Sequence, residues 1–195
     1  MNSVAIERRP IIGRLVVDGR ALACFLDAQQ SAQVTEIILI RALSRWKRKE
    51  MMDFLVTPGG FLRAQLPSDL SGKKGWQSSR DDFSTMSIVG SKLLKQAITR
   101  RVSEAAKGKC RWLTIGLDLV SEDGGTEAEL VALVDLRTGK VLRWTGKSYP
   151  TTEQERRLIQ IIDLKSHMVK LANQRVLILG CHDLNMFSPR RSEEH

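Results

Sequence analysis

The sequence predicts an α/β domain in which helices flank layered β-sheets. Two observations favour this class: helix-like and strand-like segments alternate through the first half of the chain, and a strand-rich half follows. The chain has 195 residues, of which 42% are hydrophobic, so it can bury one substantial core. We expect one main domain over residues 31–195, preceded by an N-terminal strand and turn region over residues 1–30.

The first elements are a strand, a helix and a second strand. Residues 11–17 (IIGRLVV) form a short apolar run before Asp18-Gly19, which predicts a strand and a turn. Apolar residues recur at helical spacing from 31 to 50, and Ser31 is a suitable N-cap. The compact run 53–57 (DFLVT) predicts a buried strand that stops at Pro58-Gly59-Gly60.

The middle of the chain predicts a helix and three strands. Residues 64–85 show little periodicity and predict a loop, whereas 88–107 has the apolar spacing of an amphipathic helix. The run WLTIGLDL (112–119) predicts a second buried strand. Residues 129–136 and 140–144 are strand-like runs joined by Arg137-Thr138-Gly139, which predicts a hairpin.

The last part of the chain predicts three further strands. Residues 159–164 and 167–171 are short apolar runs on either side of Lys165-Ser166. The run RVLILG (175–180) is apolar throughout and predicts a buried strand that leads directly into Cys181. The order of all these segments is typical of an α/β layered domain.

Composition limits the classes to which the protein can belong. Lys and Arg total 31 against 22 Asp and Glu, a net charge of +9, which suits either a solvated basic surface or binding of nucleic acid. No apolar run approaches the roughly 20 residues that cross a bilayer, and the N-terminus lacks signal-peptide features, so we expect a cytoplasmic protein without a membrane partner. Three widely spaced cysteines and three histidines predict neither a disulfide framework nor a metal site, and we expect no cofactor.

Cys181 is the main candidate for chemistry. It follows an apolar strand, and the ends of such strands commonly carry the catalytic residues of α/β folds. A thiol there is a nucleophile if a neighbouring group takes its proton, although a free cysteine is often only a small buried hydrophobe. His182 is adjacent, but neighbouring residues of an extended strand point to opposite faces.

Four segments in the same order resemble the nitrilase, or carbon–nitrogen hydrolase, superfamily. RVLILGCHDLNMFSP (175–189) resembles its nucleophile segment, and AELVALVDLRTGKVLRWTGKSYPTTEQER (128–156) resembles the hairpin that delivers its lysine, followed by a Pro and a Glu. DFLVTPGGF (53–61) resembles the strand that presents its first glutamate. The helix over 88–107 and the strand after it resemble the next unit, so the likeness covers about residues 32–189.

The resemblance implies a nitrilase-like α-β-β-α layered sandwich and a thiol hydrolase, or amidase, that acts on a small amide or nitrile substrate. Cys181 matches the nucleophile, and Lys147 matches the lysine that stabilises the oxyanion. Glu155, or Glu153 by a different spacing, matches the later supporting glutamate. By their residue type alone, Lys147 and both glutamates also suit a solvated surface.

Two departures from the family pattern bear on activity. Gly59 stands where the family has its first glutamate, and loss of a general base costs about 10²- to 10⁴-fold in rate. An active hydrolase and a catalytically degenerate relative therefore both fit. The family also continues well beyond its cysteine, so we expect a sandwich that is incomplete at the C-terminus. A strand near a sheet edge favours a homo-oligomer, or a partner that completes the sheet.

A rival hypothesis uses acidic residues instead of the thiol. Asp118, Asp135 and Asp183 each lie near the end of an apolar run, as do the metal-binding carboxylates of some nucleases. The positive net charge suits such a nucleic-acid-binding or metal-dependent nuclease-like protein. Asp135, however, precedes a turn, where aspartate commonly makes local hydrogen bonds.

Overall fold

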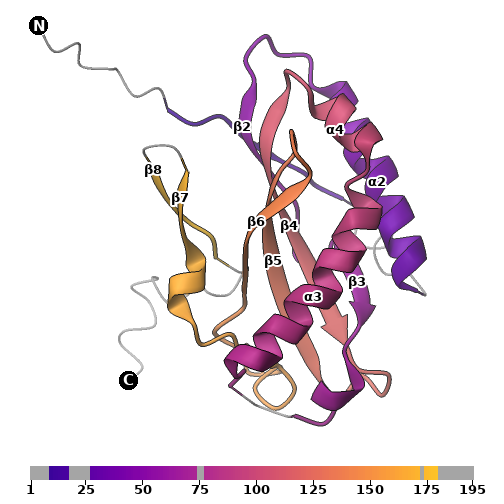
Figure 1. Cartoon of the computed structure of the whole chain (residues 1–195), viewed down its shortest axis with the longest axis vertical. Coiled ribbons are helices and arrows are strands. Elements are labelled where there is room, and N and C mark those ends of the chain that lie inside the picture. Colours follow the sequence, from indigo (N-terminus) through magenta and orange to yellow (C-terminus); the bar gives the residue numbers. More distant parts are fainter. Residues whose placement is uncertain (1–8, 18–26, 74–76, 172–173, 180–195) are drawn as a thin grey trace, which may run out of the picture.

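The computed structural model describes residues 9–17, 27–73, 77–171 and 174–179, which form a mixed α/β fold (Figure 1). The helices are α2 (Ala28–Arg45), α3 (Arg80–Ala97) and α4 (Arg100–Ala106), with short 3₁₀ turns at Ser68–Leu70 and Leu164–His167. The strands are β1 (Ile12–Arg14), β2 (Met52–Val56), β3 (Leu62–Gln65), β4 (Cys110–Val120), β5 (Glu127–Asp135), β6 (Lys140–Gly146), β7 (Met168–Leu171) and β8 (Gln174–Leu177). The predicted α/β class is confirmed.

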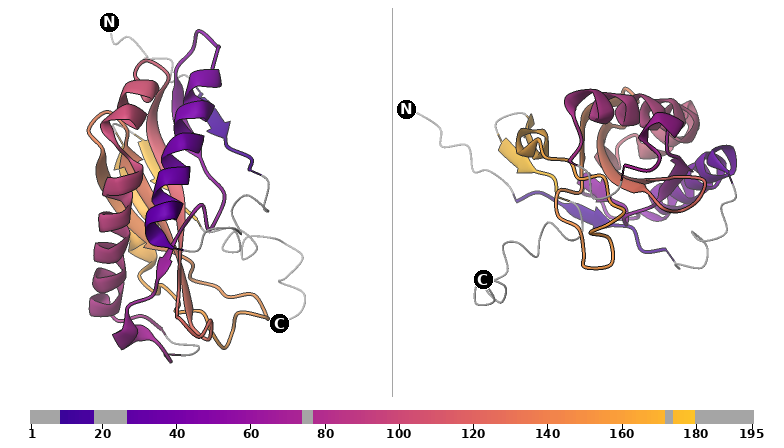
Figure 2. Two further views of the ribbon diagram at one scale, coloured as in Figure 1. Left: turned by 90° about the vertical axis from the view of Figure 1, so that its right-hand side faces the viewer. Right: turned by 90° about the horizontal axis from the view of Figure 1, so that it is seen from below.

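Six of the strands form one sheet in the order β1-β2-β4-β5-β6, with β3 also paired to β4. The pairs β1–β2, β2–β4 and β3–β4 are parallel. The pairs β4–β5 and β5–β6 are antiparallel. All three helices lie against one face of the sheet (Figure 2). That face contributes Leu113, Ile115, Leu117 and Leu119 of β4 to the main core.

The hairpin of β7 and β8 lies on the other face of the sheet (Figure 2). Its Leu171 and the following Ile178 pack against Phe54 and Leu133 in a small second core. Among the described residues the hairpin has no further strand beside it. Side chains on its outer face, such as Leu177, are exposed. The helix-covered face therefore carries most of the core, and the hairpin covers one part of the opposite face.

Several predicted elements are confirmed. The strands expected at 53–57, 112–119 and 167–171 correspond to β2, β4 and β7. The hairpin expected over 129–144 corresponds to β5 and β6. At its turn the Asp135 carboxylate accepts a hydrogen bond from the backbone of Arg137 at 2.9 Å, which is the local role expected of an aspartate there.

The predicted cap of the first helix was wrong. The helix begins four residues earlier, with Asp27 as N-cap accepting from the backbone of Gln30 at 2.8 Å, and it ends at Arg45. Ser31 is instead buried inside the helix, and its hydroxyl accepts a hydrogen bond from the backbone of Arg63 at 2.9 Å. The hydrogen bond to β3 explains why this serine lies buried inside the helix instead of capping it.

The predicted loop at 64–85 and the single helix at 88–107 were also wrong. The loop contains the second half of β3 and the start of α3, where Ser79 and Asp82 form a capping box that the apolar periodicity does not reveal. The helix breaks between α3 and α4 at Ile98 and Thr99. At the break the Thr99 hydroxyl donates to Glu36 of α2 at 2.7 Å, so packing between helices accompanies the interruption.

Two further strand predictions need correction. Residues 159–164 form isolated bridges at their start and then the beginning of a 3₁₀ turn, so they are not a strand. The run 175–180 is a strand only to Leu177, and it pairs with β7 instead of joining the large sheet. Leu177 is 48% exposed whereas Ile178 is buried, because a two-stranded hairpin can bury only one of its faces.

Candidate active site

Charged side chains form a row across four neighbouring strands on the face of the sheet that lacks helices. Arg63 of β3 lies opposite Asp118 of β4, and Asp118 lies opposite Glu129 of β5. Lys147 follows β6 and continues the register, since its backbone N–H donates to the carbonyl of Glu129 at 2.8 Å. Partners in register point to the same face. We call Arg63, Asp118, Glu129 and Lys147 the charged row.

The alternation of β4 and β5 places the charged row on this face. On β4, Leu117 and Leu119 are buried beneath the helices, so Asp118 between them points to the opposite side. On β5, Ala128 and Leu130 are buried in the same core and leave Glu129 on the side of Asp118. A strand with apolar residues at every second position therefore presents its charges on one face only.

Lys147 is the most deeply buried member of the charged row, with only 3% of its surface exposed. Its ammonium donates to the Glu129 carboxylate at 3.1 Å and to the side-chain oxygen of Gln154. Gln154 in turn donates to the carboxylate of Glu127 at 2.8 Å. A buried ammonium is tolerated only with such partners, which hold it in one position.

Asp118 is the carboxylate whose pKa is most clearly perturbed. Burial and, second, the negative charge of Glu129 raise the pKa of Asp118 from 3.8 to about 6, although the positive charge of Arg63 opposes the shift. Among the described residues, no hydrogen bond reaches its carboxylate. A carboxyl group that titrates close to neutral pH can accept and return a proton under physiological conditions.

The Asp118 carboxylate lies against the loop of Pro58, Gly59 and Gly60. A Cβ added to Gly60 would be 2.3 Å from the Asp118 Oδ2, and Gly60 has φ +61°, so only glycine fits there without strain. A Cβ on Gly116 would be 2.7 Å from the Pro58 carbonyl oxygen and 2.9 Å from the Gly59 Cα. The loop and β4 are therefore in direct backbone contact beside Asp118.

His167 links the residue after Lys147 to the segment that precedes Cys181. Its Nδ1 donates to the carbonyl of Ile178 at 2.7 Å, and its Nε2 lies 2.9 Å from the Ser148 hydroxyl oxygen. Ser148 donates to the carbonyl of Ile161 at 2.6 Å. His167 is buried, and the backbone N–H of Ile178 donates to its carbonyl at 2.8 Å. This cluster fixes Ile178 next to the end of β6.

The predicted site residues have different positions. Lys147 lies in the charged row, where its ammonium bonds to the Glu129 carboxylate and to the Gln154 side chain. Glu155 is exposed, and its neighbour Gln154 makes the contact with Lys147. Cys181 lies outside the described residues.

The carboxylates of the rival hypothesis do not meet. Asp135 lies opposite Trp112, six positions along β4 from Asp118, so about 20 Å separates the two aspartates. Asp183 lies outside the described residues. Nowhere in the described ranges do three or more metal-ligating side chains gather in one place. Asp118 and Asp135 therefore cannot share a metal ion.

Sequence reasoning missed three polar members of this region: Glu129, Gln154 and His167. The alternating pattern of AELVALVD contains the signal for Glu129, since a charge between apolar positions marks the face opposite the core. Gln154 and His167 gain their roles from contacts with residues 19 to 27 positions away, for which the local sequence contains no signal.

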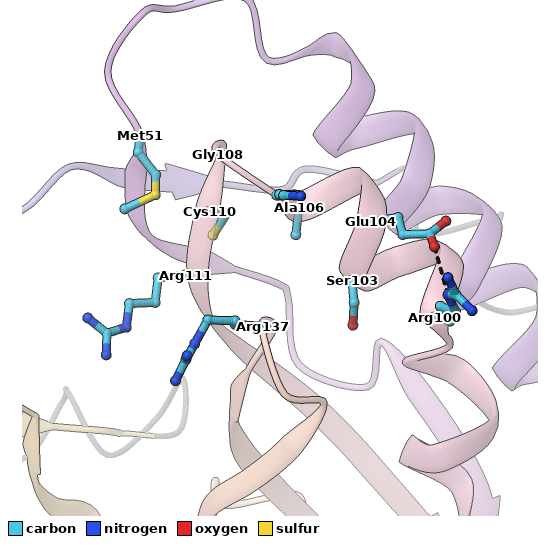
Figure 3. A pocket seen from close by; sticks show the side chains of 10 residues that line it. Met51, Arg100, Ser103, Glu104, Ala106, Gly108, Cys110, Arg111 and Arg137 are labelled. Atoms are coloured by element: carbon cyan, nitrogen blue, oxygen red, sulfur yellow. Dashed lines mark hydrogen bonds and ion pairs between the residues drawn. The ribbon is translucent and has the colours of Figure 1, made fainter.

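A cavity of about 730 Å³ lies at the other end of β4 (Figure 3). Its basic lining residues are Arg100, Lys107, Arg111 and Arg137, and Arg100 is paired with Glu104 at 2.8 Å. Cys110 also lines it, but burial raises the pKa of that thiol to about 12, so it is not a reactive nucleophile. The chemistry of the charged row therefore makes it the better candidate for an active site.

Comparisons with known proteins give a distant structural likeness. No known family matches the chain, and no curated protein matches it. Among solved structures, the NitN amidase from Neterenkonia sp. AN1 has a TM-score of 0.42 and 14% sequence identity over 89% of this chain. The chain spans 55% of that amidase. In the described ranges, no helix has both the length and the apolar character needed to span a membrane.

Proposed function

We propose that this protein is a nitrilase-like thiol hydrolase that cleaves the carbon–nitrogen bond of a small amide or nitrile. Cys181 is the nucleophile, Lys147 stabilises the oxyanion, and Glu155 is the supporting acid beside the site. The buried Lys147 supports this proposal, because an ammonium removed from water interacts strongly with a developing negative charge. Glu129 and Gln154 support it further by holding the ammonium in one position.

The single observation that carries the proposal is the hydrogen-bonded link through His167. Ile178 is held to His167, which contacts Ser148, the neighbour of Lys147. Cys181 is three positions after Ile178 in the sequence, and a fully extended chain of three residues spans about 10 Å. These contacts hold Ile178, three positions before the thiol, near the residue that follows Lys147, and this supports the hydrolase hypothesis.

The proposed reaction follows from these side chains. The Cys181 thiol gives its proton to a base and attacks the amide carbon, and the carbonyl electrons become an oxyanion beside Lys147. The tetrahedral adduct collapses, the amine leaves with the proton, and a thioester remains. Water then releases the acid and restores the thiol.

The hairpin of β7 and β8 also fits the proposed fold. It packs on the face of the large sheet opposite the helices through Leu171 and Ile178. We propose that it begins the second sheet of an α-β-β-α sandwich, with residues 31–195 as one domain. A homo-oligomer or another partner then completes this sheet, and size-exclusion chromatography that gives only a monomer would contradict that part of the proposal.

A thiol-labelling experiment tests the nucleophile. The protein is treated with iodoacetamide at pH 7, and labelling of Cys181, Cys110 and Cys24 is followed by peptide mass spectrometry. We expect Cys181 to react fastest, because a nearby base assists its deprotonation. Equal or slower labelling of Cys181 than of the buried Cys110 would contradict the proposed function.

An activity assay tests the lysine. Ammonia release is measured on a panel of small aliphatic and aromatic amides and nitriles. We expect Lys147→Met to lower kcat about 10²- to 10³-fold, as removal of an oxyanion donor does, and Cys181→Ser to abolish turnover. Lys140→Met, at an exposed position at the start of β6, is the matched control and should retain activity.

A second candidate function, binding of nucleic acid, is favoured by the basic cavity. Arg111 and Arg137 project from neighbouring strand ends there, since the backbone of Leu136 donates to the carbonyl of Arg111 at 2.9 Å (Figure 3). Oligonucleotide affinity that falls steeply with salt would support this function. Replacement of both arginines by alanine should then lower the salt dependence by about two ionic contacts, and unchanged affinity would contradict it.

A further inference from the structure

We propose that the cavity at the start of β4 binds a phosphate monoester that is attached to an apolar or planar body. The cavity lies about 26 Å from Asp118, because eight strand positions separate Cys110 from that residue. The proposal therefore concerns a second site and does not rest on the hydrolase function. It names the group that this cavity recognises, whether a free small molecule or the end of a nucleic acid supplies it.

One wall of the cavity is apolar. It consists of Met51, Ala106 and Cys110, at the place where α4 ends and β4 begins (Figure 3). Ala106 is 2% exposed and Cys110 is 5% exposed, so this wall is continuous with the main core. A volume of about 730 Å³ is in the range of small-molecule sites, which combine an apolar lining with a few charged groups. The wall therefore suits the apolar or planar part of a ligand.

Three cationic side chains line the cavity without a carboxylate partner. Lys107, Arg111 and Arg137 form no ion pair with any residue that the structure describes. The fourth basic residue, Arg100, is paired with Glu104 at 2.8 Å. A phosphate monoester has a charge of about −1.5 to −2 at pH 7 and three acceptor oxygens. It therefore matches three uncompensated positive charges better than a single carboxylate does.

Contacts with the backbone and with a ring hold two of these arginines side by side. The backbone N–H of Leu136 donates to the carbonyl of Arg111 at 2.9 Å, which places Arg137 beside Arg111. Both side chains extend to the same side of the cavity (Figure 3). The Arg111 guanidinium lies over the Trp112 ring, 4.6 Å from its centroid. A stacked guanidinium keeps the N–H donors at its edge, and these form paired hydrogen bonds with phosphate oxygens.

Two groups of the lining that would repel an anion are neutralised. The negative charge of Glu104 is compensated by Arg100. Burial raises the pKa of Cys110 to about 12, so this thiol is uncharged at neutral pH. Its Sγ donates to the carbonyl of Trp112 at 3.3 Å. The electrostatic field in the cavity therefore remains positive and favours an anion.

The test is isothermal titration calorimetry of the full chain with AMP and phenyl phosphate, and with adenosine and phenol. We expect each phosphate monoester to bind at one site, and its counterpart without phosphate to bind at least about tenfold more weakly. Arg111→Ala and Arg137→Ala should each weaken AMP binding about tenfold, because each removes charged donors. Arg143→Ala is the matched control, since Arg143 is an exposed arginine of β6 that does not line this cavity.

Two oligonucleotides of one sequence, with and without a 5′-phosphate, identify the source of the group. Tight binding of AMP itself points to a free nucleotide-like ligand. A preference for the 5′-phosphorylated oligonucleotide that Arg137→Ala removes points to the end of a nucleic acid. Either result supports the proposal, because the phosphate monoester is recognised in both.

Three results would overturn the proposal. They are no binding of AMP, phenyl phosphate or the 5′-phosphorylated end, unchanged AMP affinity in both arginine variants, and equal binding of the two oligonucleotides without displacement by AMP. The last result would leave binding of a nucleic-acid backbone in place. Ammonia release and its loss in Lys147→Met are independent of all these measurements, so failure of one proposal is distinguishable from failure of the other.

Discussion

The two faces of the large sheet differ in what they bury. On the helix-covered face, β4 and β5 present only apolar side chains, among them Leu117, Leu119 and Leu130, each at most 1% exposed. On the opposite face the same strands present Asp118 and Glu129 towards Lys147. Adjacent residues of one strand thus lie in a dry core and in a charged cluster.

The difference separates the face that stabilises the fold from the face that carries the proposed active site. Apolar burial contributes stability in proportion to area, so the helix-covered face stabilises the fold. Buried charges contribute little net stability and are strongly perturbed by their neighbours. Replacement of Asp118, which accepts no hydrogen bond among the described residues, should therefore preserve stability, whereas truncation on the helix-covered face should lower it.

The largest effect is expected from a truncation on the helix-covered face. Leu119→Ala removes a fully buried side chain and should lower the free energy of unfolding by about 2–5 kcal/mol, because the cavity it leaves is only partly filled. Val120→Ala, at the next residue and on the other face, is only partly buried and should cost about 1 kcal/mol or less. Urea unfolding measures both, and equal losses would remove the distinction between the faces.

Removal of the buried carboxylate should stabilise the protein. The pKa of Asp118 rises from 3.8 to about 6 on folding, so its ionisation opposes folding above pH 6 and has no effect below about pH 4. Asp118→Asn should therefore gain up to about 3 kcal/mol at pH 7 and little at pH 4. Unfolding free energies of both proteins across this range test the sign, and a loss that grows with pH would contradict it.

The close backbone contact between β4 and the loop at Pro58 should make the stability of the protein sensitive to one added carbon atom at Gly116. Gly116→Ala places a Cβ 2.7 Å from the Pro58 carbonyl oxygen, so the loop must move, at a cost of about 1–3 kcal/mol. Gly59→Ala meets nothing within 4 Å and should change stability by less than about 0.5 kcal/mol. Thermal unfolding compares the two variants, and a neutral Gly116→Ala would show that the loop yields freely.

The smallest expected effect concerns Cys110. Burial raises the pKa of this thiol to about 12, so at pH 8 the folded protein should leave it unlabelled by a disulfide reagent within minutes. In urea the same thiol should react completely. Rapid labelling of Cys110 in the folded protein would mean that the start of β4 opens readily.

Local patterns predicted part of this fold. Apolar runs identified β2 and β4, and a turn signal between two runs identified the hairpin of β5 and β6. The start of α3 was missed because a capping box, and not apolar spacing, defines it. Ser31 was misjudged because its hydroxyl serves β3, which lies 32 residues further along the chain.

The site was predicted less completely than the fold. Lys147 was proposed from the resemblance, and the structure shows that it is buried and paired with Glu129. Gln154 was overlooked beside Glu155, since the choice between neighbours depends on which side chain a turn directs inward. The rival hypothesis grouped Asp118 with Asp135 and Asp183, but the antiparallel register of β4 and β5 keeps Asp118 and Asp135 about 20 Å apart.

The sequence by itself determined the two-sided character of the strands, because a period of two separates Leu117 and Leu119 from Asp118 in any sheet that buries one face. Only the tertiary structure decided that Asp118, Glu129 and Lys147 become neighbours. Register and strand order depend on packing between segments distant in sequence. Such packing sets which charges meet in a region of low dielectric, and hence the pKa of Asp118.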